Sequence, residues 1–179
     1  MWEADLSLFR SGQWIHLQIR FRDASEVPED PPLWHGVVPV GDDGLLCWVD
    51  PWELGIVLCD VFDEETPRLQ YLPLPMENIW GEPSNRNVCA TAGGDVIKFF
   101  NIFPRCCCGG AGASSCERSC HSYTIETWTM RIGNGDMEWV KDGIVDASEP
   151  WALDSYKGLR CFPLDHPVVS LDEPEVICF

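Results

Sequence analysis

Residues 44–62 read GLLCWVDPWELGIVLCDVF, and this stretch decides the fold. Two apolar runs, 44–49 and 55–62, flank an Asp-Pro-Trp-Glu segment that supplies the turn residues a hairpin requires. A third apolar run at 69–72 ends before two prolines, which stop a strand because proline has no N–H to donate to the ladder. We therefore expect an antiparallel meander of three strands in this part of the chain.

The same scheme of strand, tight turn and return strand recurs on both sides of this meander. The further runs with strand character lie at 13–21, 88–91, 96–103, 123–132, 137–140, 168–171 and 176–179. Hairpin-based units of about forty residues are typical of propeller blades. The sequence predicts an all-β chain of antiparallel meanders, an incomplete β-propeller-like fragment of two to three blades, with little helix beyond a turn at 149–154.

We expect residues 1–179 to form a single β-rich domain that is a fragment of a longer propeller-like domain. The last pair of runs stops in the middle of a unit at Phe179. Residues 104–121 interrupt the second group of strands and are expected to be a Cys/Gly-rich loop insertion. Open sheet edges at a cut between blades tend to associate, so poor solubility of the isolated chain is expected.

The net charge of the chain limits the classes of partner that we expect it to bind. Twelve basic residues stand against 29 acidic ones, for a formal charge of -17. Such a chain repels phosphate backbones and anionic lipid, so nucleic acid and membrane surfaces are excluded as expected partners. The first five residues carry acids where a secretory leader needs basic ones, and no apolar run approaches the ~20 residues of a membrane helix. We expect an intracellular protein, cytoplasmic or nuclear.

The ten cysteines are expected to be reduced thiols, because a disulfide framework belongs to short secreted chains. Four of them lie inside apolar runs, where a thiol behaves as a small hydrophobe. These four, Cys47, Cys59, Cys89 and Cys178, are predicted to pack in the core.

Seven stretches carry a family resemblance: 6–14 (LSLFRSGQW), 37–50 (VVPVGDDGLLCWVD), 55–61, 72–75, 105–110 (RCCCGG), 127–131 (TWTMR) and 167–179 (PVVSLDEPEVICF). Together they resemble the plant family of domain of unknown function sixteen-eighteen, which is expanded in grasses. The resemblance implies a mostly β, propeller-like arrangement akin to the domains attached to F-box proteins. It also implies members longer at both ends, so that this chain resembles a truncated product. The family brings no established activity and no catalytic residues.

The Cys-rich loop is the one cluster of metal-binding residue types. Its candidate ligands are Cys106, Cys108, Cys116, Cys120 and His121. Thiolates with an imidazole suit Zn²⁺, so a zinc-binding or redox-sensitive structural element is an alternative function. The spacing C-x-C followed by C-x-x-x-C-H matches no known zinc knuckle, and a hairpin insertion with reduced or adventitiously oxidised thiols is the favoured explanation. No cofactor is expected unless this loop binds zinc.

No catalytic motif occurs in the sequence. The patterns G-x-S-x-G, H-E-x-x-H and the P-loop are all missing, and Cys120 with His121 would point to opposite faces of a strand. A carboxylate-type hydrolase remains a further alternative, since propellers can host paired acids, but nothing distinguishes two of the 29. We predict that the chain is not an enzyme.

Trp52 is the candidate partner-binding residue. It lies in the turn at 50–53, where an exposed ring can anchor a partner protein, although turn aromatics also fold back onto their own hairpins. Tryptophans in or beside the strands, namely Trp48, Trp128, Trp139 and Trp151, are expected to fill the core. The sequence therefore predicts a non-enzymatic, propeller-like protein-interaction module that binds a protein partner.

Overall fold

The structure, a computed structural model, describes residues 3–22, 27, 35–41, 44–50, 52, 55–63, 67–76, 83–91, 93–105, 123–133, 137–146, 152–158, 164, 166–170, 173 and 176–178. Strands dominate these ranges, and their helical structure is two single 3-10 turns. The chain is all-β with antiparallel, propeller-like meanders, as the sequence predicts. None of the helical segments in these ranges has the length and apolar composition of a membrane span.

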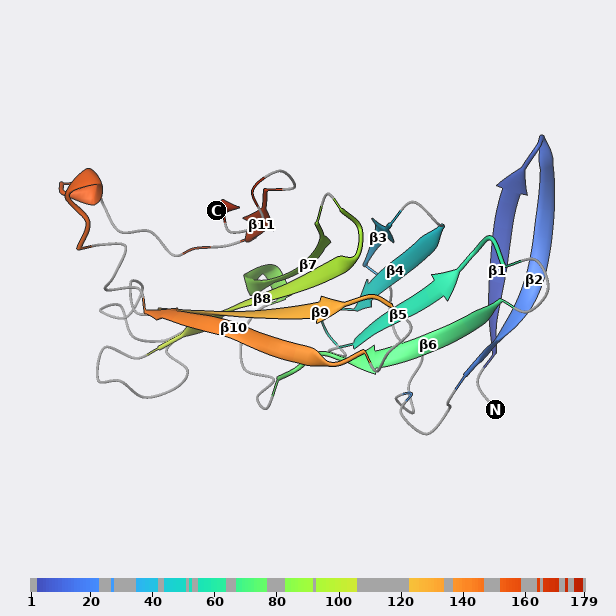
Figure 1. Cartoon of the computed structure of the whole chain (residues 1–179), viewed down its shortest axis with the longest axis horizontal. Coiled ribbons are helices and arrows are strands. Elements are labelled where there is room, and N and C mark those ends of the chain that lie inside the picture. Colours follow the sequence, from blue (N-terminus) through green and yellow to red (C-terminus); the bar gives the residue numbers. More distant parts are fainter. Residues whose placement is uncertain are drawn as a thin grey trace. The chain divides into compact units, whose positions relative to one another are not determined.

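Two compact units divide the chain, Met1–Leu74 and Pro75–Phe179. The first unit holds a six-stranded sheet in the order β1-β2-β6-β5-β4-β3 (Figure 1). Its strands are β1 (Glu3–Arg10), β2 (Gln13–Phe21), β3 (Gly36–Val40), β4 (Leu45–Asp50), β5 (Gly55–Asp60) and β6 (Arg68–Pro73). The predicted meander is confirmed as β4-β5-β6, in which each strand pairs antiparallel with the next.

The meander is built around β5, whose residues 55–59 are all buried. A strand with neighbours on both sides and covered faces reads as a continuous apolar run, as this one does. Gly55 begins the strand and lies against the ring of Tyr71 on β6. A Cβ at this position would lie 2.3 Å from Cε2 of Tyr71, so only glycine fits.

The β1–β2 hairpin covers one face of the meander. Its two-residue turn, Ser11-Gly12, has positive φ at both positions, as the tight hairpin turns require. Alternate residues of the hairpin, including Leu6, Leu17 and Ile19, pack with the buried cluster of β5 and β6. Strand β2 joins the rest of the sheet through a short parallel pairing with β6, at Arg20↔Arg68 and Phe21↔Leu69.

The second unit holds a four-stranded sheet in the order β10-β9-β8-β7. Its strands are β7 (Arg86–Ala90), β8 (Val96–Pro104), β9 (Tyr123–Arg131) and β10 (Trp139–Asp146), followed by the short pair β11 (Val168–Val169) and β12 (Ile177–Cys178). All pairings are antiparallel, and four strands in sequential order are the topology of a propeller blade. The predicted strands of this half are confirmed.

Stacked aromatic rings form part of the core of the second unit. Phe99 is fully buried, and its ring centroid lies 5.2 Å from that of Trp128 and 6.1 Å from that of Trp139. Lys141 extends over Trp128, with Nζ 5.1 Å from the ring centroid, and pairs with Glu126 at 3.1 Å. The predicted core role is confirmed for Trp128, which is 5% exposed, whereas Trp139 is half-buried. Trp48 of the first unit is half-buried against its core cluster, and Trp151 lies outside the described residues.

The short pair β11–β12 is attached to β7. Nδ2 of Asn87 donates a 2.6 Å hydrogen bond to the carbonyl of Pro167, and the backbone N–H of His166 donates to the carbonyl of Ser84 at 2.7 Å. Ser84 belongs to the 3-10 turn η1 (Pro83–Asn85). Ile177 packs against a buried cluster of β8 and β9, so the C-terminal strands are part of the second unit's core.

The helical turn differs in position from the prediction of 149–154. The structure has a 3-10 turn η2 (Asp154–Tyr156), and residues 149–151 lie outside the described ranges. Leu153 is extended, with φ -68° and ψ 139°, so the helical backbone begins only at Asp154.

Candidate functional site

The turn between β4 and β5 presents Trp52 to solvent. The side chain is 54% exposed, and its backbone N–H donates a 2.9 Å hydrogen bond to Oδ1 of Asp50. Asp50 is fully buried at the end of β4. An aspartate that accepts from the N–H two residues ahead forms an Asx-turn, which fixes the backbone locally. A buried carboxylate therefore fixes the backbone at the position that carries the exposed indole.

His35 lies beside this indole. The two ring centroids are 6.4 Å apart with planes tilted by 48°, and His35 is itself exposed. The backbone N–H of His35 donates to the carbonyl of Val49 at 3.1 Å, which extends the β3–β4 pairing to the edge of the turn. We call these two rings, Trp52 and His35, the Trp52 surface. Of the two alternatives that the sequence left open for Trp52, an exposed ring or a ring folded back onto its hairpin, the structure shows the exposed ring.

A second group of exposed aromatic side chains lies near the tip of the β1–β2 hairpin. Phe9 and Trp14 are both 64% exposed, with ring centroids 5.2 Å apart as a cross-strand pair. The Trp14 ring stacks on that of His16 at 6.5 Å, and His16 Nδ1 lies 2.9 Å from Oγ of Ser7. Sequence reasoning missed this group because β1 was not predicted. The sequence does contain a signal for this group, because two aromatic residues flank a two-residue Ser-Gly turn.

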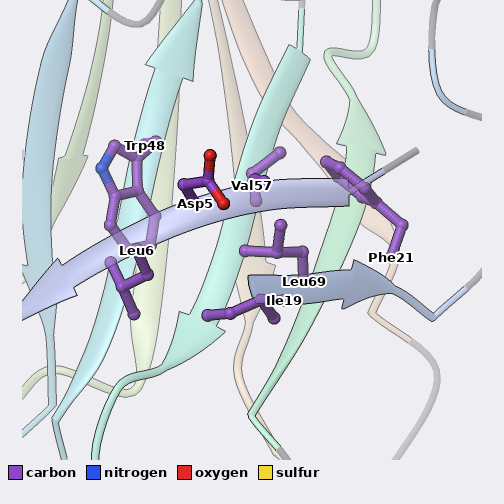
Figure 2. Close-up of a pocket in the computed structure, with 8 residues that line it drawn as sticks. Asp5, Leu6, Ile19, Phe21, Trp48, Val57 and Leu69 are labelled. Atoms are coloured by element: carbon purple, nitrogen blue, oxygen red, sulfur yellow. The ribbon is translucent and has the colours of Figure 1, made fainter. Parts of the chain in front are cut away.

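A pocket of about 120 Å³ lies between the hairpin and the sheet of the first unit (Figure 2). Its described lining residues come from five strands: Ala4, Asp5 and Leu6 of β1, Ile19 and Phe21 of β2, Trp48 of β4, Val57 of β5 and Leu69 of β6. Ile19 and Val57 are each 2% exposed. The sequence did not predict this pocket, because it depends on the packing of the hairpin across the meander.

Two thiols in the strands, Cys47 and Cys59, are buried, and a third, Cys89, is half-buried. Burial raises the pKa of Cys47 to about 12, and burial with the nearby carboxylates of Asp60 and Asp63 raises the pKa of Cys59 to about 11. The pKa of Cys89 also rises to about 11 through burial, against the opposing effect of Lys98. The thiolate is the nucleophile, so these groups are packing residues. The predicted core role is confirmed for Cys47 and Cys59, and Cys89 is only partly in the core.

The prediction for Cys178 is wrong, because this thiol is exposed. Strand neighbours point to opposite faces, and in the two-residue strand β12 it is Ile177 that packs against the core.

The proposed zinc ligands, Cys106, Cys108, Cys116, Cys120 and His121, lie outside the described residues. The described part of the chain contains no group of three or more His, Cys, Asp or Glu side chains arranged to hold a metal ion. The candidate sites that the structure describes are therefore the Trp52 surface and the pocket under the hairpin.

Comparison with known proteins finds a similarity to one solved structure and a match to one family model. The solved structure is a hypothetical selenium-binding protein from Sulfolobus tokodaii, with a TM-score of 0.42 and 14% identity over 80% of this chain. This chain spans 35% of that protein, and a likeness of this size identifies neither a shared fold nor a shared function. No curated protein matches the chain.

The family model described as "Protein of unknown function (DUF1618)" matches residues 48–178. The match begins in β4 and continues through β12. It includes the stretches at 55–61, 72–75, 105–110 and 127–131 on which the resemblance was based. The chain belongs to the DUF1618 family of proteins of unknown function.

Proposed function

We propose that this chain is a non-enzymatic protein-interaction module that docks a partner protein through the Trp52 surface. The observation that carries the proposal is an exposed indole on a turn fixed by a buried carboxylate, Asp50. Tryptophan is among the residues enriched at the energetic centres of protein interfaces. A side chain on a pre-organised turn loses little further freedom on binding, which favours affinity.

The neighbouring ring strengthens this proposal. His35 lies 6.4 Å from Trp52, so a partner side chain that covers the indole also contacts the imidazole. An exposed pair of rings offers a larger flat apolar area than a lone turn residue. The formal charge of -17 supports a protein partner over nucleic acid or anionic lipid, and we propose a cytoplasmic or nuclear location for the complex.

Affinity capture from plant extract tests the proposal, with Trp52→Ala compared against wild type. The matched control is Trp14→Ala, which removes another exposed indole, from the hairpin. We expect a reproducible partner that wild type and Trp14→Ala retain and Trp52→Ala loses. The purified partner should then bind Trp52→Ala at least ~10-fold more weakly, which corresponds to about 1.4 kcal/mol. Equal binding by wild type and Trp52→Ala would overturn the proposal.

Zinc binding by the Cys-rich loop is the second candidate, favoured by the five thiols and one imidazole within residues 106–121. Metal analysis of the chain purified under reducing conditions decides it, with a Cys116→Ser/Cys120→Ser double variant for comparison. About one zinc per chain in wild type and a clear loss in the variant would support the site. A zinc content near zero in wild type would remove it.

A further inference from the structure

The pocket under the β1–β2 hairpin has two walls that are distant in sequence. Ala4 and Leu6 with Ile19 and Phe21 form the hairpin side, and the strands of the meander form the other with Trp48, Val57 and Leu69. In Figure 2 the ribbon that carries Asp5 and Leu6 crosses the strand that carries Val57, and the rings of Trp48 and Phe21 lie on opposite sides of the view. The pocket therefore lies within one unit and depends on the hairpin for half of its lining.

The lining selects for uncharged, apolar molecules. Seven of the eight described lining residues are apolar, and the eighth, Asp5, is an exposed residue. Asp5 and Leu6 leave β1 on opposite sides in Figure 2, as strand neighbours do. Transfer of a charge or an unpaired polar group to such a lining costs several kcal/mol.

The size of the pocket indicates how large the ligand is. An apolar cavity of about 150 Å³ accepts a benzene molecule in an engineered protein. This pocket, at about 120 Å³, is close to that size and is partly open, so substituents on a ring can extend beyond it. The aromatic side chains of Trp48 and Phe21 provide surfaces on which a flat ring packs in offset or edge geometry.

We propose that this pocket binds a small uncharged apolar molecule of about one aromatic ring. This site is separate from the Trp52 surface and holds whether or not that surface binds a protein.

Methyl NMR of the full chain with toluene as the probe tests the proposal. We expect saturable shifts, and intermolecular nuclear Overhauser effects from toluene to the methyl groups of Leu6, Ile19 and Val57. Benzoate, which has a similar shape and a negative charge, should bind at least ~10-fold more weakly because the apolar lining offers its carboxylate no hydrogen-bond donor and Asp5 repels it. Equal affinity of the two probes, or no saturable toluene shift, would overturn the proposal.

A filled pocket provides the second test. Ala4→Leu adds three carbons at the lining, whereas Ser7→Leu makes the corresponding change on the outer, exposed face of the same strand. We expect Ala4→Leu to weaken toluene binding at least ~10-fold and Ser7→Leu to leave it unchanged. If Ala4→Leu does not fold, the nuclear Overhauser effects between toluene and the wild-type methyl groups test the location of the site on their own. Toluene binding of undiminished strength in folded Ala4→Leu would place the probe elsewhere and contradict the proposal.

Discussion

The backbone N–H of Trp52 donates a 2.9 Å hydrogen bond to Oδ1 of Asp50, whose side chain is fully buried. Loss of this acceptor leaves a turn N–H without its partner and removes packed atoms from the end of β4. Asp50→Ala should therefore lower the free energy of unfolding by about 1–3 kcal/mol. Urea unfolding followed by tryptophan fluorescence measures the change.

Asp60 supplies the matched control for Asp50. Its Oδ1 accepts hydrogen bonds from the N–H groups of Phe62 and Asp63 at 2.9 and 3.1 Å, but Asp60 is exposed. Solvent replaces these bonds when the side chain is removed, so Asp60→Ala should cost under ~1 kcal/mol. A larger loss from Asp60→Ala than from Asp50→Ala would show that burial of Asp50 does not stabilise the turn.

Gly55→Ala should destabilise the first unit strongly. The new Cβ would lie 2.3 Å from Cε2 and 2.4 Å from the hydroxyl oxygen of Tyr71, so the ring of this buried side chain must move. We expect a loss of about 1–3 kcal/mol, the usual range for overpacking. Gly36 also begins a strand, but a methyl group added there would meet no atom within 4 Å, so Gly36→Ala should change stability far less.

The Tyr71 ring can be tested as the cause. In the background of Tyr71→Leu, the cost of Gly55→Ala should fall, giving a coupling energy between the two positions. Additive effects of the two substitutions would assign the loss to the backbone of Gly55 and contradict the packing explanation.

Stability should fall as the solution becomes alkaline. Burial raises the pKa of Cys47 from 9.0 to about 12. Below pH 9 the thiol is protonated in both states and has no effect; above it the unfolded state loses the proton that the folded state keeps. Between pH 9 and 12 this thiol should lower the free energy of unfolding by up to about 1.4 kcal/mol per pH unit.

The measurement is a series of urea unfolding curves from pH 8 to pH 11 for wild type and Cys47→Val. The variant removes the titrating group and keeps an apolar side chain, so its pH dependence should be shallower. Identical slopes for the two proteins would show that Cys47 keeps an ordinary pKa in the folded state.

Asp142 should contribute more to the free energy of unfolding than Asp146. Each of the two carboxylates forms an ion pair in the second unit. Oδ2 of Asp142 accepts a 2.6 Å hydrogen bond from Thr129 and lies 3.8 Å from Nζ of Lys98, which is 17% exposed. The pair of Asp146 with Arg105, at 3.6 Å, is nearly half exposed on both sides. We expect a loss of about 1–2 kcal/mol for Asp142→Ala and under ~1 kcal/mol for Asp146→Ala. Thermal unfolding in low salt ranks the two variants, and the reverse order would contradict this account.

Much of the strand architecture could be predicted because the central strands are apolar runs bounded by turn residues. The run at 55–59 and the strands around Phe99 and Trp128 are of this kind. Strand β3 was not predicted; it contains Pro39, which is unfavourable inside a central strand, but β3 lies at the edge of its sheet, where proline is tolerated. Strand β1 was also not predicted, although Ala4, Leu6 and Leu8 alternate with polar residues as they do in a strand. The acids of this segment served only as evidence against a secretory leader.

Contacts between distant segments could not be predicted from local pattern. The parallel pairing of Arg20 with Arg68 joins residues 48 positions apart, and the pocket depends on it. The place of Trp52 in a turn left both an exposed ring and a folded-back ring possible, and its contact with His35 required the register of β3 against β4. Local sequence specifies strands and turns; the partners of the edge strands depend on the packing of the whole unit.

Photo-crosslinking tests the binding role of the Trp52 surface most directly. A benzophenone side chain replaces His35, whose ring lies 6.4 Å from Trp52, and the control carries it at Val140, an equally accessible position on β10. The account predicts a specific crosslink between the purified partner and position 35, reduced when Trp52→Ala is added, and none from position 140. Crosslinking of equal yield from both positions, or a yield at position 35 that Trp52→Ala leaves unchanged, would contradict it.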